Sequence, residues 1–542
     1  MALQTRWFAE PLHYLTFGPV AFQENRAGYP SLSKHHQELI NMYMRLKNAP
    51  WMLVHDVGPS PQEFEEASGL DFPSLAEAHS GAAALPQPNT YVSYLRYLER
   101  RQEPLTHLEA STLTSFQDWL QSPLQPLSDN LESSTYEMFE GDPVKYDQYE
   151  NAITAAMAEW KELKKPTSSV PHTNNTLPPE PELVVAVAGA GRGPLVTRVL
   201  RASEKTGMPI QLWALEKNQN AYVYLLRQNK REWGGKVHVV KTDMRDWDGP
   251  VPDGYSSICT TTVDILVTEL LGSFGDNELS PECLDGIQVH LARPHGISIP
   301  HSYTAHLSPI SYPRIHAELS NRLPTDAHSF ETPWVIHLFA IDFVSQTVPG
   351  RPRFQQAWEF VHPVRLPFAE DWLLDQGPSK PRRGGAGSIH LSAGLNEHNA
   401  RHCHLAFVCR ARGVVHGLAG YFESVLYKPQ VEGKEPIELS TLPEEIDRKS
   451  KDMISWFPIF FPLKVRRPRR RESGQEANAD ASQKPLYFPQ DAELEVTMWR
   501  QTDDTKVWYE WIVEAFAWVG PSSRVKVGAS ELHSSRKVAC LM

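Results

Sequence analysis

The chain has 542 residues, of which 41% are hydrophobic, and a formal net charge of −12 at pH 7. This length is too great for one hydrophobic core, so two or three domains are expected. No stretch approaches the roughly 18 uninterrupted apolar residues of a membrane-spanning helix, so we expect no membrane insertion. The negative charge argues against direct nucleic-acid binding and is compatible with a basic protein as partner.

Cysteine usage favours a reducing compartment, the cytoplasm or the nucleus, because the five cysteines are scattered without a CxxC pair. They are Cys259, Cys283, Cys403, Cys409 and Cys540. The run His402-Cys403-His404 could be a set of metal ligands, but alternation along a strand would point Cys403 away from both histidines. We therefore expect no metal site.

The first 120 residues predict βα units. Apolar runs at Tyr14–Phe22 and Trp51–Val57 alternate with helical periodicity at Lys34–Lys47 and Thr90–Arg101. Such alternation is typical of a parallel sheet with crossover helices.

A second parallel, doubly wound sheet is predicted between residues 183 and 299. The polar, proline-rich segment 160–182 precedes it and predicts a linker. Beyond this segment, helical patterns alternate with predicted strands. The strands are Val184–Ala188, Ile210–Leu215, Val237–Val240 and Val263–Val267.

Strand signals dominate after Pro300. In the stretch KVWYEWIVEA, one set of apolar residues alternates with Trp508 and Ile512. That set is Val507, Tyr509, Trp511 and Val513. This pattern predicts a β-sandwich or a β-barrel.

A glycine-rich loop follows the first strand of the second sheet. The stretch VVAVAGAGRGPL predicts a strand, the loop Gly189-Ala190-Gly191-Arg192-Gly193, and a helix opened by Pro194. Glycines let the backbone turn sharply and approach a ligand, and the following helix N-terminus favours negative groups. A dinucleotide site would need GxGxxG, but Pro194 occupies the last position, which weakens a nicotinamide interpretation.

Acidic residues end the next two strands. Glu216 ends the second strand, where it could accept hydrogen bonds from both ribose hydroxyls. Asp243 ends the third, and Met244 beside it could pack on an adenine face. Ligands of open α/β sheets bind beyond the carboxyl ends of the strands, so the pattern predicts a nucleoside ligand. The alternative is that each acid is only a solvated strand end.

The loop TELLGSFGDNE delivers two carboxylates from the end of the fourth strand. Glu269 follows the strand directly, and Gly272 and Gly275 let the chain fold back to bring Glu278 alongside. Two converging carboxylates repel each other unless a cation lies between them, and an arginine guanidinium can be gripped by both. A divalent metal or a glycoside would also suit paired acids, but neither explains a nucleoside pocket on the same rim.

Several of these stretches closely resemble the protein arginine methyltransferases: VAGAGRGPL, LEKNQNA, TDMRDW and especially TELLGSFGDNELSPECLDG. Others resemble the type II branch, which makes symmetric dimethylarginine: LQSPLQPLSDNLESSTYEMFEGDPVKYDQYENAI, HGLAGYFESVLY, ISWFPIFFPLK and KVWYEWIV. The resemblance extends from about Leu12 to Val513. It implies a partial TIM-type barrel (residues 1–120), a Rossmann-like α/β methyltransferase domain (121–299), and a C-terminal β-barrel with a dimerisation segment (300–542).

The resemblance implies S-adenosylmethionine as the methyl donor. The substrates it implies are arginines in Gly-rich basic segments of histones and RNA-binding proteins. The implied cofactor contacts are Tyr136, Lys145, Tyr146, Gly189, Gly191, Arg192, Gly193, Glu216, Asp243 and Met244. Lys145 and Arg192 suit the methionine carboxylate, and aromatic rings suit the sulfonium. Glu269 and Glu278 are the implied catalytic pair that orients the guanidinium.

Three further residues are implied to shape substrate binding and product choice. Ser455 and Trp456 occupy the place of a Thr-His-Trp loop in type I relatives, and Trp456 would pack on the arginine stem rather than in the barrel core. Phe139, one helical turn after Tyr136, would lie against the slot between donor and guanidinium. Type I relatives have a methionine at that position, whose unbranched chain can bend aside where a ring cannot.

The N-terminal region is short for this family, because a TIM barrel has eight βα units and roughly 250 residues. We therefore expect a chain truncated relative to the family. The resemblance also implies self-association through the C-terminal region. The WD-repeat subunit that docks on the barrel in animal relatives is not expected. The stretch DGYSSICTTT near Cys259 is an expected insertion, and the basic run Lys464–Arg471 predicts a solvated loop or a nuclear-import signal. The alternatives to a methyltransferase are a catalytically weak scaffold of the same fold and a nucleotide-dependent oxidoreductase.

Overall fold

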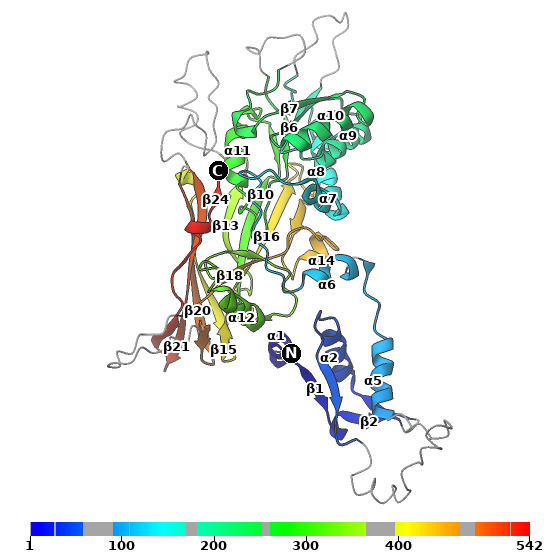
Figure 1. The fold of residues 1–542 in the computed structure, drawn as a ribbon. Helices are drawn as coiled ribbons and strands as arrows, with labels where there is room; N and C mark the ends of the chain where they lie inside the picture. The colour runs from blue at the N-terminus through cyan, green and yellow to red at the C-terminus, as the bar shows by residue number, and fades with distance from the viewer. Residues whose placement is uncertain are drawn as a thin grey trace, which may run out of the picture. The chain divides into compact units, whose positions relative to one another are not determined.

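The computed structural model describes residues 2–26, 29–57, 90–107, 109–169, 182–251, 261–364, 396–465, 483–503, 505–520 and 522–542. The chain forms two compact units (Figure 1). Unit 1 comprises Met1–Trp119, Tyr312–Ile315 and His337–Asp342, and unit 2 comprises the remaining residues.

Unit 1 contains one parallel βαβ arrangement. Strand β1 (Tyr14–Phe17) pairs in parallel with β4 (Trp51–Val54), and α2 (Lys34–Met44) connects them. A small antiparallel pair, β2 (Phe22–Glu24) and β3 (Pro30–Leu32), follows β1. The described part of the unit also contains the helices α1 (Ala2–Ala9), α5 (Thr90–Arg100) and the short α6 (Thr114–Phe116). Its main core consists of Phe17, Leu32, Ile40, Leu95 and Leu98. The predicted helices and the predicted strand at Trp51 are therefore confirmed, whereas the run Tyr14–Phe22 is divided by a short helical turn at Pro19–Ala21, where Pro19 cannot continue the strand pairing.

The second predicted sheet is confirmed as five parallel strands in the order β7-β6-β5-β8-β9. Their bounds are β5 Leu183–Ala188, β6 Ile210–Glu216, β7 Val237–Lys241, β8 Ile265–Thr268 and β9 Ile297–Ile299. Every residue of the apolar strand β5 is buried, as expected where helices cover both faces of a parallel sheet.

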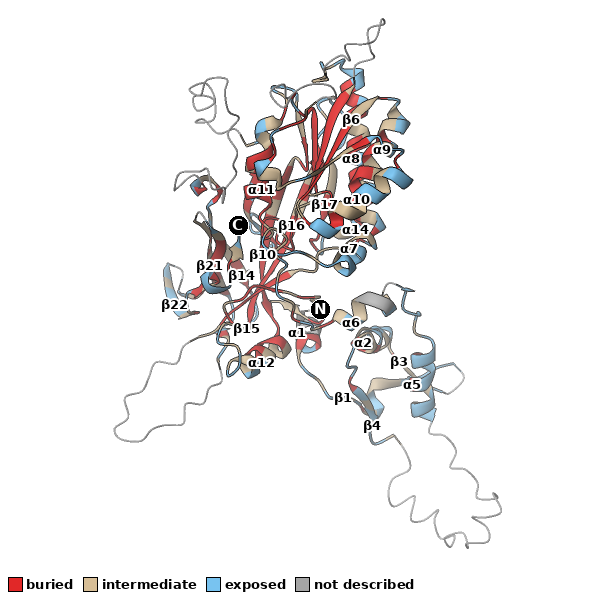
Figure 2. Cartoon of the chain, turned by 45° about the horizontal axis from the view of Figure 1, so that its top comes forward, coloured by how far each residue is buried: buried red, intermediate tan, exposed pale blue. Residues whose placement is uncertain are grey.

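Helices cover both faces of this sheet (Figure 2). On one face lie α8 (Pro143–Glu162), α9 (Pro194–Thr206) and α10 (Gln219–Arg231), whose apolar residues share a core with alternate residues of β5. On the other face lies α11 (Ser280–Ile287), which packs against the remaining residues of β5. Both faces of the sheet are therefore covered by helices, so a ligand can reach the sheet only at the strand ends.

The C-terminal region is β-rich, as predicted, and consists mainly of two antiparallel sheets with one shared core. The first sheet contains β10 (Ser302–Ser311), β11 (Trp334–Val335), β12 (Asp342–Phe343), β13 (Gln355–Val361), β16 (Gly417–Tyr427), β17 (Ile437–Ser440) and β18 (Ile459–Pro462). The second contains β14 (Arg401–Cys409), β20 (Ala492–Thr502), β21 (Lys506–Val519), β22 (Ser523–Ala529), β23 (His533–Ser534) and β24 (Cys540–Leu541). The strand β15 (Gly413–Val415) pairs with β19 (Leu486–Phe488). The described part of this region also contains the helices α12 (Pro313–Arg322) and α14 (Ile446–Lys449).

Two predictions from strand alternation hold in these sheets. In β21, Val507, Tyr509, Trp511 and Val513 are all buried. In β14, Cys403 is buried while the flanking histidines are exposed, so the three side chains do not converge. Across the described ranges, no group of three His, Cys, Asp or Glu side chains is arranged to hold a metal ion, and no helix is long and apolar enough to span a membrane.

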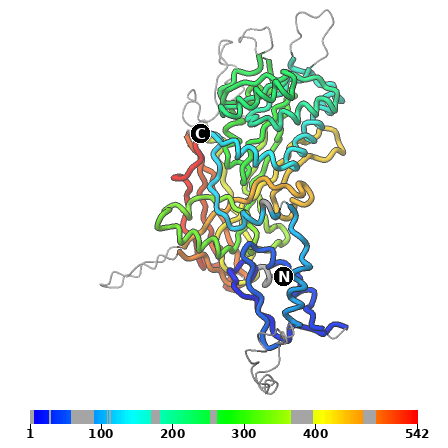
Figure 3. The backbone as a smooth tube through the Cα atoms, turned by 45° about the vertical axis from the view of Figure 1, so that its right-hand side comes forward, coloured from blue at the N-terminus to red at the C-terminus, as the bar shows by residue number. Residues whose placement is uncertain are grey.

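The C-terminus lies beside the segment that leads into the parallel-sheet region (Figure 3). The backbone N–H of Leu541 donates to Gln125 Oε1 at 3.2 Å. Some predicted features lie outside the described residues: Cys259 and most of its insertion, linker residues 170–181, and 466–471 of the basic run.

Candidate active site

The glycine loop after β5 has the backbone conformation that glycine alone adopts readily. Gly191 and Gly193 have φ values of +56° and +95°. A Cβ on Gly191 would lie 3.2 Å from the Tyr136 ring, and one on Gly193 would lie 2.5 Å from Trp233. The loop therefore needs glycine both for its turn and for its close neighbours, and Gly193 opens α9 just before Pro194.

Glu216 fixes this loop from the end of β6. Its Oε2 accepts from the Gly191 N–H at 2.7 Å, and its Oε1 accepts from the Asn218 N–H at 2.7 Å. Burial raises the pKa of Glu216, and the backbone hydrogen bonds counteract that rise. Asn218, which the sequence did not single out, caps α10 and donates to Leu131 O at 3.0 Å. Each carboxylate oxygen still has a lone pair for a further donor.

Asp243 lies on the same rim, but its carboxylate is already paired. Arg245 donates to it from Nε (3.0 Å) and Nη2 (2.9 Å). Burial alone would raise the pKa of Asp243, but the hydrogen bonds and charge of Arg245 outweigh burial and lower it. Met244 packs close to the glycine loop, since a Cβ on Gly189 would lie 3.3 Å from Met244 Cε.

The short helix α7 (Ser133–Glu140) packs on the glycine loop, with Tyr136 against Gly191. Arg192 holds this helix, because Nη1 lies 2.6 Å from Glu137 Oε1 and Nε lies 3.2 Å from Glu140 Oε1. The guanidinium also lies over the Tyr224 ring, 4.3 Å from its centroid. Arg192 was predicted to meet the methionine carboxylate, and in this structure its partners are the two glutamates of α7.

The predicted fold-back between Glu269 and Glu278 is present. Gly272 and Gly275 exchange backbone hydrogen bonds of 3.2 and 2.8 Å. Asn277 Oδ1 accepts from the Phe274 N–H at 2.7 Å, and it sits where a Cβ on Gly272 would clash. Burial raises the pKa of Glu278 well above its usual range, and the nearby charge of Glu269 raises it further. The two carboxylates are therefore close enough to interact.

Lys145 provides a cation beside this pair. Its Nζ lies 3.3 Å from Glu269 Oε2, and its side chain is 2% exposed. Burial lowers the pKa of Lys145, but the nearby Glu269, Tyr146 and Asp142 together outweigh burial and raise it. The ammonium also lies 5.4 Å from the ring centroid of Phe139, 4.8 Å from that of Tyr146 and 5.0 Å from that of Trp456. Carboxylate and rings together make a slot that holds a cation.

Trp456 reaches this slot from the C-terminal region. Its Nε1 donates to Leu271 O at 2.6 Å, which ties it to the fold-back, and its ring meets Phe422 edge-on at 5.1 Å. Ser455 is held by its backbone, whose N–H donates to Asp142 Oδ2 at 2.7 Å. Phe139 meets Tyr136 edge-on at 6.4 Å, the proximity expected from their spacing on a helix.

A fully buried arginine, Arg500, binds acidic residues on both sides of Glu278 in the sequence. Arg500 of β20 binds Asp276 through Nε at 2.5 Å. It binds both oxygens of Glu282 through Nη1 and Nη2, at 2.9 and 2.8 Å. Tyr509 and Trp358 also donate to Asp276, at 2.8 and 2.9 Å. Sequence reasoning missed this cluster, although Arg500 falls on the buried phase of an alternating strand, which is a detectable signal.

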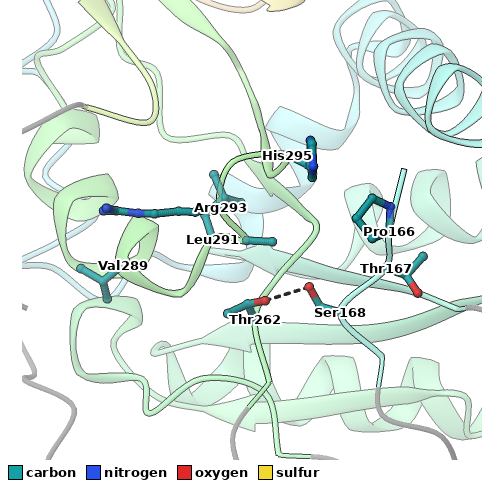
Figure 4. Close-up of a pocket in the computed structure, with 9 residues that line it drawn as sticks. Pro166, Thr167, Ser168, Thr262, Val289, Leu291, Arg293 and His295 are labelled. Atoms are coloured by element: carbon teal, nitrogen blue, oxygen red, sulfur yellow. Dashed lines mark hydrogen bonds between the residues drawn. The ribbon is translucent and has the colours of Figure 1, made fainter. Parts of the chain in front are cut away.

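A pocket lies at the opposite end of the parallel sheet (Figure 4). Its volume is about 450 Å³, and its lining includes Ser168 and Thr262, whose hydroxyls are hydrogen-bonded at 2.7 Å. Thr262 precedes β8, whereas Glu269 follows it. This pocket is therefore separate from the carboxylate pair.

Comparison with known proteins agrees with this geometry. Residues 107–299 match the family model described as PRMT5 arginine-N-methyltransferase, residues 302–477 and 481–542 the PRMT5 oligomerisation domain, and residues 1–102 the PRMT5 TIM barrel domain.

Curated relatives match most of the chain. The chain is 36% identical to protein arginine N-methyltransferase skb1 of Schizosaccharomyces pombe over 542 residues, covering 100% of the chain and 70% of the relative. It is 36% identical to protein arginine N-methyltransferase 5 of Oryza sativa subsp. indica, covering 94% and 64%, and 34% identical to that of Xenopus laevis, covering 94% and 63%. The chain thus spans about two thirds of the length of these relatives. It belongs to the PRMT5 family of protein arginine N-methyltransferases.

Proposed function

We propose that this chain transfers methyl groups from S-adenosylmethionine to arginine side chains of proteins, giving monomethylarginine and symmetric dimethylarginine. The observation that carries the proposal is the cation slot at the end of β8. There Glu269 raises the pKa of Glu278, and the rings of Phe139, Tyr146 and Trp456 lie 4.8–5.4 Å from the Lys145 ammonium. Family membership supports the same reaction.

The residues beside the slot fit the donor. A side chain at position 191 would press on the Tyr136 ring, so only glycine fits there. The Glu216 carboxylate accepts a hydrogen bond from the Gly191 backbone N–H. These are the features that a ribose needs, and Met244 beside Gly189 offers an apolar surface for a base. When bound, S-adenosylmethionine supplies a methyl group on a positively charged sulfur. The Tyr136 ring packs on Gly191 and the Phe139 ring meets Tyr136 edge-on, and such rings favour a cation.

The carboxylate pair would orient the guanidinium and manage a proton. A guanidinium has donors enough to bind Glu269 and Glu278 at once, which fixes one nitrogen toward the donor. Arginine is protonated at neutral pH, so one N–H proton must leave for each methyl group gained. The raised pKa of Glu278 suits its carboxylate for holding that proton.

The proposed substrates are arginines in Gly-rich basic segments of proteins such as histones and RNA-binding proteins, in the cytoplasm and the nucleus. The net charge of −12 supports basic partners. The match to an oligomerisation domain supports self-association through the C-terminal region.

The test is a methylation assay on a Gly-Arg-rich peptide with S-adenosylmethionine, in which mass spectrometry distinguishes symmetric from asymmetric dimethylarginine. Symmetric product is expected. Cofactor binding without product would favour the scaffold alternative, and binding of NAD instead of S-adenosylmethionine would favour an oxidoreductase. Either outcome would refute the proposal.

A further inference from the structure

Asp142 is a fully buried residue at the junction between α7 and α8. Its Oδ1 accepts from the backbone N–H groups of Val144 (3.0 Å) and Lys145 (3.3 Å). Its Oδ2 accepts from the backbone N–H groups of Ile454 (3.0 Å) and Ser455 (2.7 Å). One carboxylate therefore joins two segments that are more than three hundred residues apart in the chain.

The two segments carry different walls of the cation slot. The first turn of α8 carries Lys145 and Tyr146, and the loop after Ser455 carries Trp456. Trp456 has a φ of +66°, a conformation that a residue other than glycine keeps only where its surroundings fix it. Asp142 fixes the residue immediately before it, and Leu271 O fixes its ring nitrogen.

An ordinary helix cap explains only half of these contacts. A cap needs one oxygen to accept from the second or third residue of the helix, and Oδ1 does this for α8. The bonds from Oδ2 to Ile454 and Ser455 add nothing to the helix. They hold the Trp456 loop against the start of α8.

We infer that Asp142 is a positioning residue for substrate arginine, and that it sets the distance between the Trp456 ring and the Lys145, Glu269 side of the slot. The inference rests on the proposed function. Asp142 contacts the slot residues through the backbone and not through the slot itself, so its loss should weaken binding of the arginine side chain more than binding of the cofactor.

Two variants separate positioning from capping. Asp142→Ser keeps a good cap for α8 but is too short to reach Ile454 and Ser455 as well. Asp142→Asn keeps the shape but turns an amide N–H toward one pair of donors, so at least one pair of bonds is lost. Both variants should therefore bind the substrate arginine more weakly than the wild type.

A matched control lies at the other end of the sheet. Asp264 is also fully buried and accepts from the backbone N–H groups of Ser168 (3.0 Å) and Val184 (2.9 Å). It too joins two distant segments, but it precedes β8, whereas the slot follows it. Asp264→Asn should lower thermal stability without changing substrate affinity.

The experiment combines amide hydrogen exchange with binding of a Gly-Arg-rich peptide to the chain saturated with S-adenosylhomocysteine. In both Asp142 variants, amides of residues 452–457 should exchange about tenfold faster or more, and the peptide Kd should rise about tenfold, the order of effect of lost bonds to a charged group. In Asp142→Ser, whose side chain still caps α8 and so keeps Lys145 and Tyr146 in place, the Kd for S-adenosylhomocysteine should change by less than about threefold.

Each outcome either supports or overturns the positioning role of Asp142. Unchanged exchange at residues 452–457 would overturn the inference, and so would faster exchange with unchanged peptide affinity. Equal loss of peptide affinity in Asp264→Asn would show a general effect of instability. A wild-type chain that binds and methylates no arginine peptide would instead refute the proposed function, which the wild-type arm shows by itself.

Discussion

Asp264 and Glu269 are carboxylates at the two ends of strand β8, and their surroundings differ. Asp264 accepts hydrogen bonds from neutral groups, the backbone N–H of Val184 and the backbone and hydroxyl of Ser168. Glu269 faces the ammonium of Lys145 and a second carboxylate, Glu278. Among the described residues, no cation lies within ion-pair distance of Glu278. One end of the strand thus has its acceptors filled, and the other has two carboxyl groups beside a single ammonium.

The difference shows how a structural acid and a ligand-binding acid can be told apart. A buried carboxylate with enough hydrogen-bond donors stabilises the fold and needs nothing more. Two carboxylates beside one ammonium are strained in the free protein, and a second cation would relieve the strain. The following predictions test this contrast between the two ends of β8.

The largest expected effect is on turnover. Glu269→Gln and Glu278→Gln should each lower turnover by more than about 100-fold, because a positioned charge on the guanidinium is removed. Asp264→Asn should leave the turnover of the folded protein within about threefold. Steady-state rates with a Gly-Arg-rich peptide measure both, and near-normal turnover in either glutamine variant would refute the hypothesis that both carboxylates bind the guanidinium.

The second effect is on the free energy of unfolding, through the buried ion pairs of Arg500 near Glu278. Arg500→Met would leave Asp276 and Glu282 buried without their cation and should lower the free energy of unfolding by about 3–5 kcal/mol. Denaturant unfolding measures it. As a control, Arg448→Met removes an ion pair to Glu445 that is open to solvent, and it should leave the midpoint unchanged. A similar midpoint for both variants would contradict the anchoring role of Arg500.

The third effect is on the cofactor. Glu216→Ala removes a charged acceptor from the glycine loop and should weaken S-adenosylmethionine binding by about 1.5–3 kcal/mol. Calorimetry gives the affinity, and circular dichroism checks that the sheet is retained. An unchanged affinity would place the ribose elsewhere.

The fourth effect is on pH dependence. Burial and the charge of Glu269 raise the pKa of Glu278, so its carboxyl keeps a proton at pH values where an exposed glutamate is ionised. A guanidinium favours the ionised form, so the peptide should bind more tightly as pH rises, by up to about tenfold per pH unit, until Glu278 is ionised. For the free chain the sign is opposite, because the stability contributed by Glu278 is lost as pH rises through its folded pKa.

Fluorescence anisotropy of a labelled peptide across this range measures the effect. In Glu278→Gln, peptide affinity should depend less on pH than in the wild type. A wild-type affinity that falls with rising pH would contradict the assignment of the proton to Glu278.

The smallest effect is on product choice. Phe139 lies beside Tyr136 and 5.4 Å from the Lys145 ammonium, as a wall of the slot requires. Phe139→Met should let some monomethylated arginine rebind in the other orientation and add asymmetric to symmetric product. Isomer-resolved mass spectrometry measures the ratio. Purely symmetric product from an active variant would show that Phe139 is only a packing residue.

Much of the fold could be predicted from the sequence because its signals are local. The strands β5 to β8 appear as apolar runs between turns, and Pro194 marks the start of α9. The convergence of Glu269 and Glu278 was also predictable, since Gly272 and Gly275 mark a tight loop between them. These features depend on residues within one short stretch.

The rest depends on partners far apart in the chain. Arg500 meets Asp276 across 224 positions, and Asp142 meets Ile454 across 312. No periodicity links such pairs, so the sequence could show that Arg500 is on a buried phase but not what it binds. The pairing of Lys145 with Glu269, and of Arg192 with Glu137, is likewise set by the packing of α7 and α8.

Calorimetric titration of a Gly-Arg-rich peptide into the chain saturated with S-adenosylhomocysteine tests the central claim most directly. The claim is that the carboxyl pair after β8 binds an arginine guanidinium. Wild type and Asp264→Asn should bind with the same affinity, and Glu278→Gln should bind at least about tenfold more weakly, because one charge-assisted contact is lost. Equal affinity of Glu278→Gln and wild type, or equal weakening by Asp264→Asn, would contradict it.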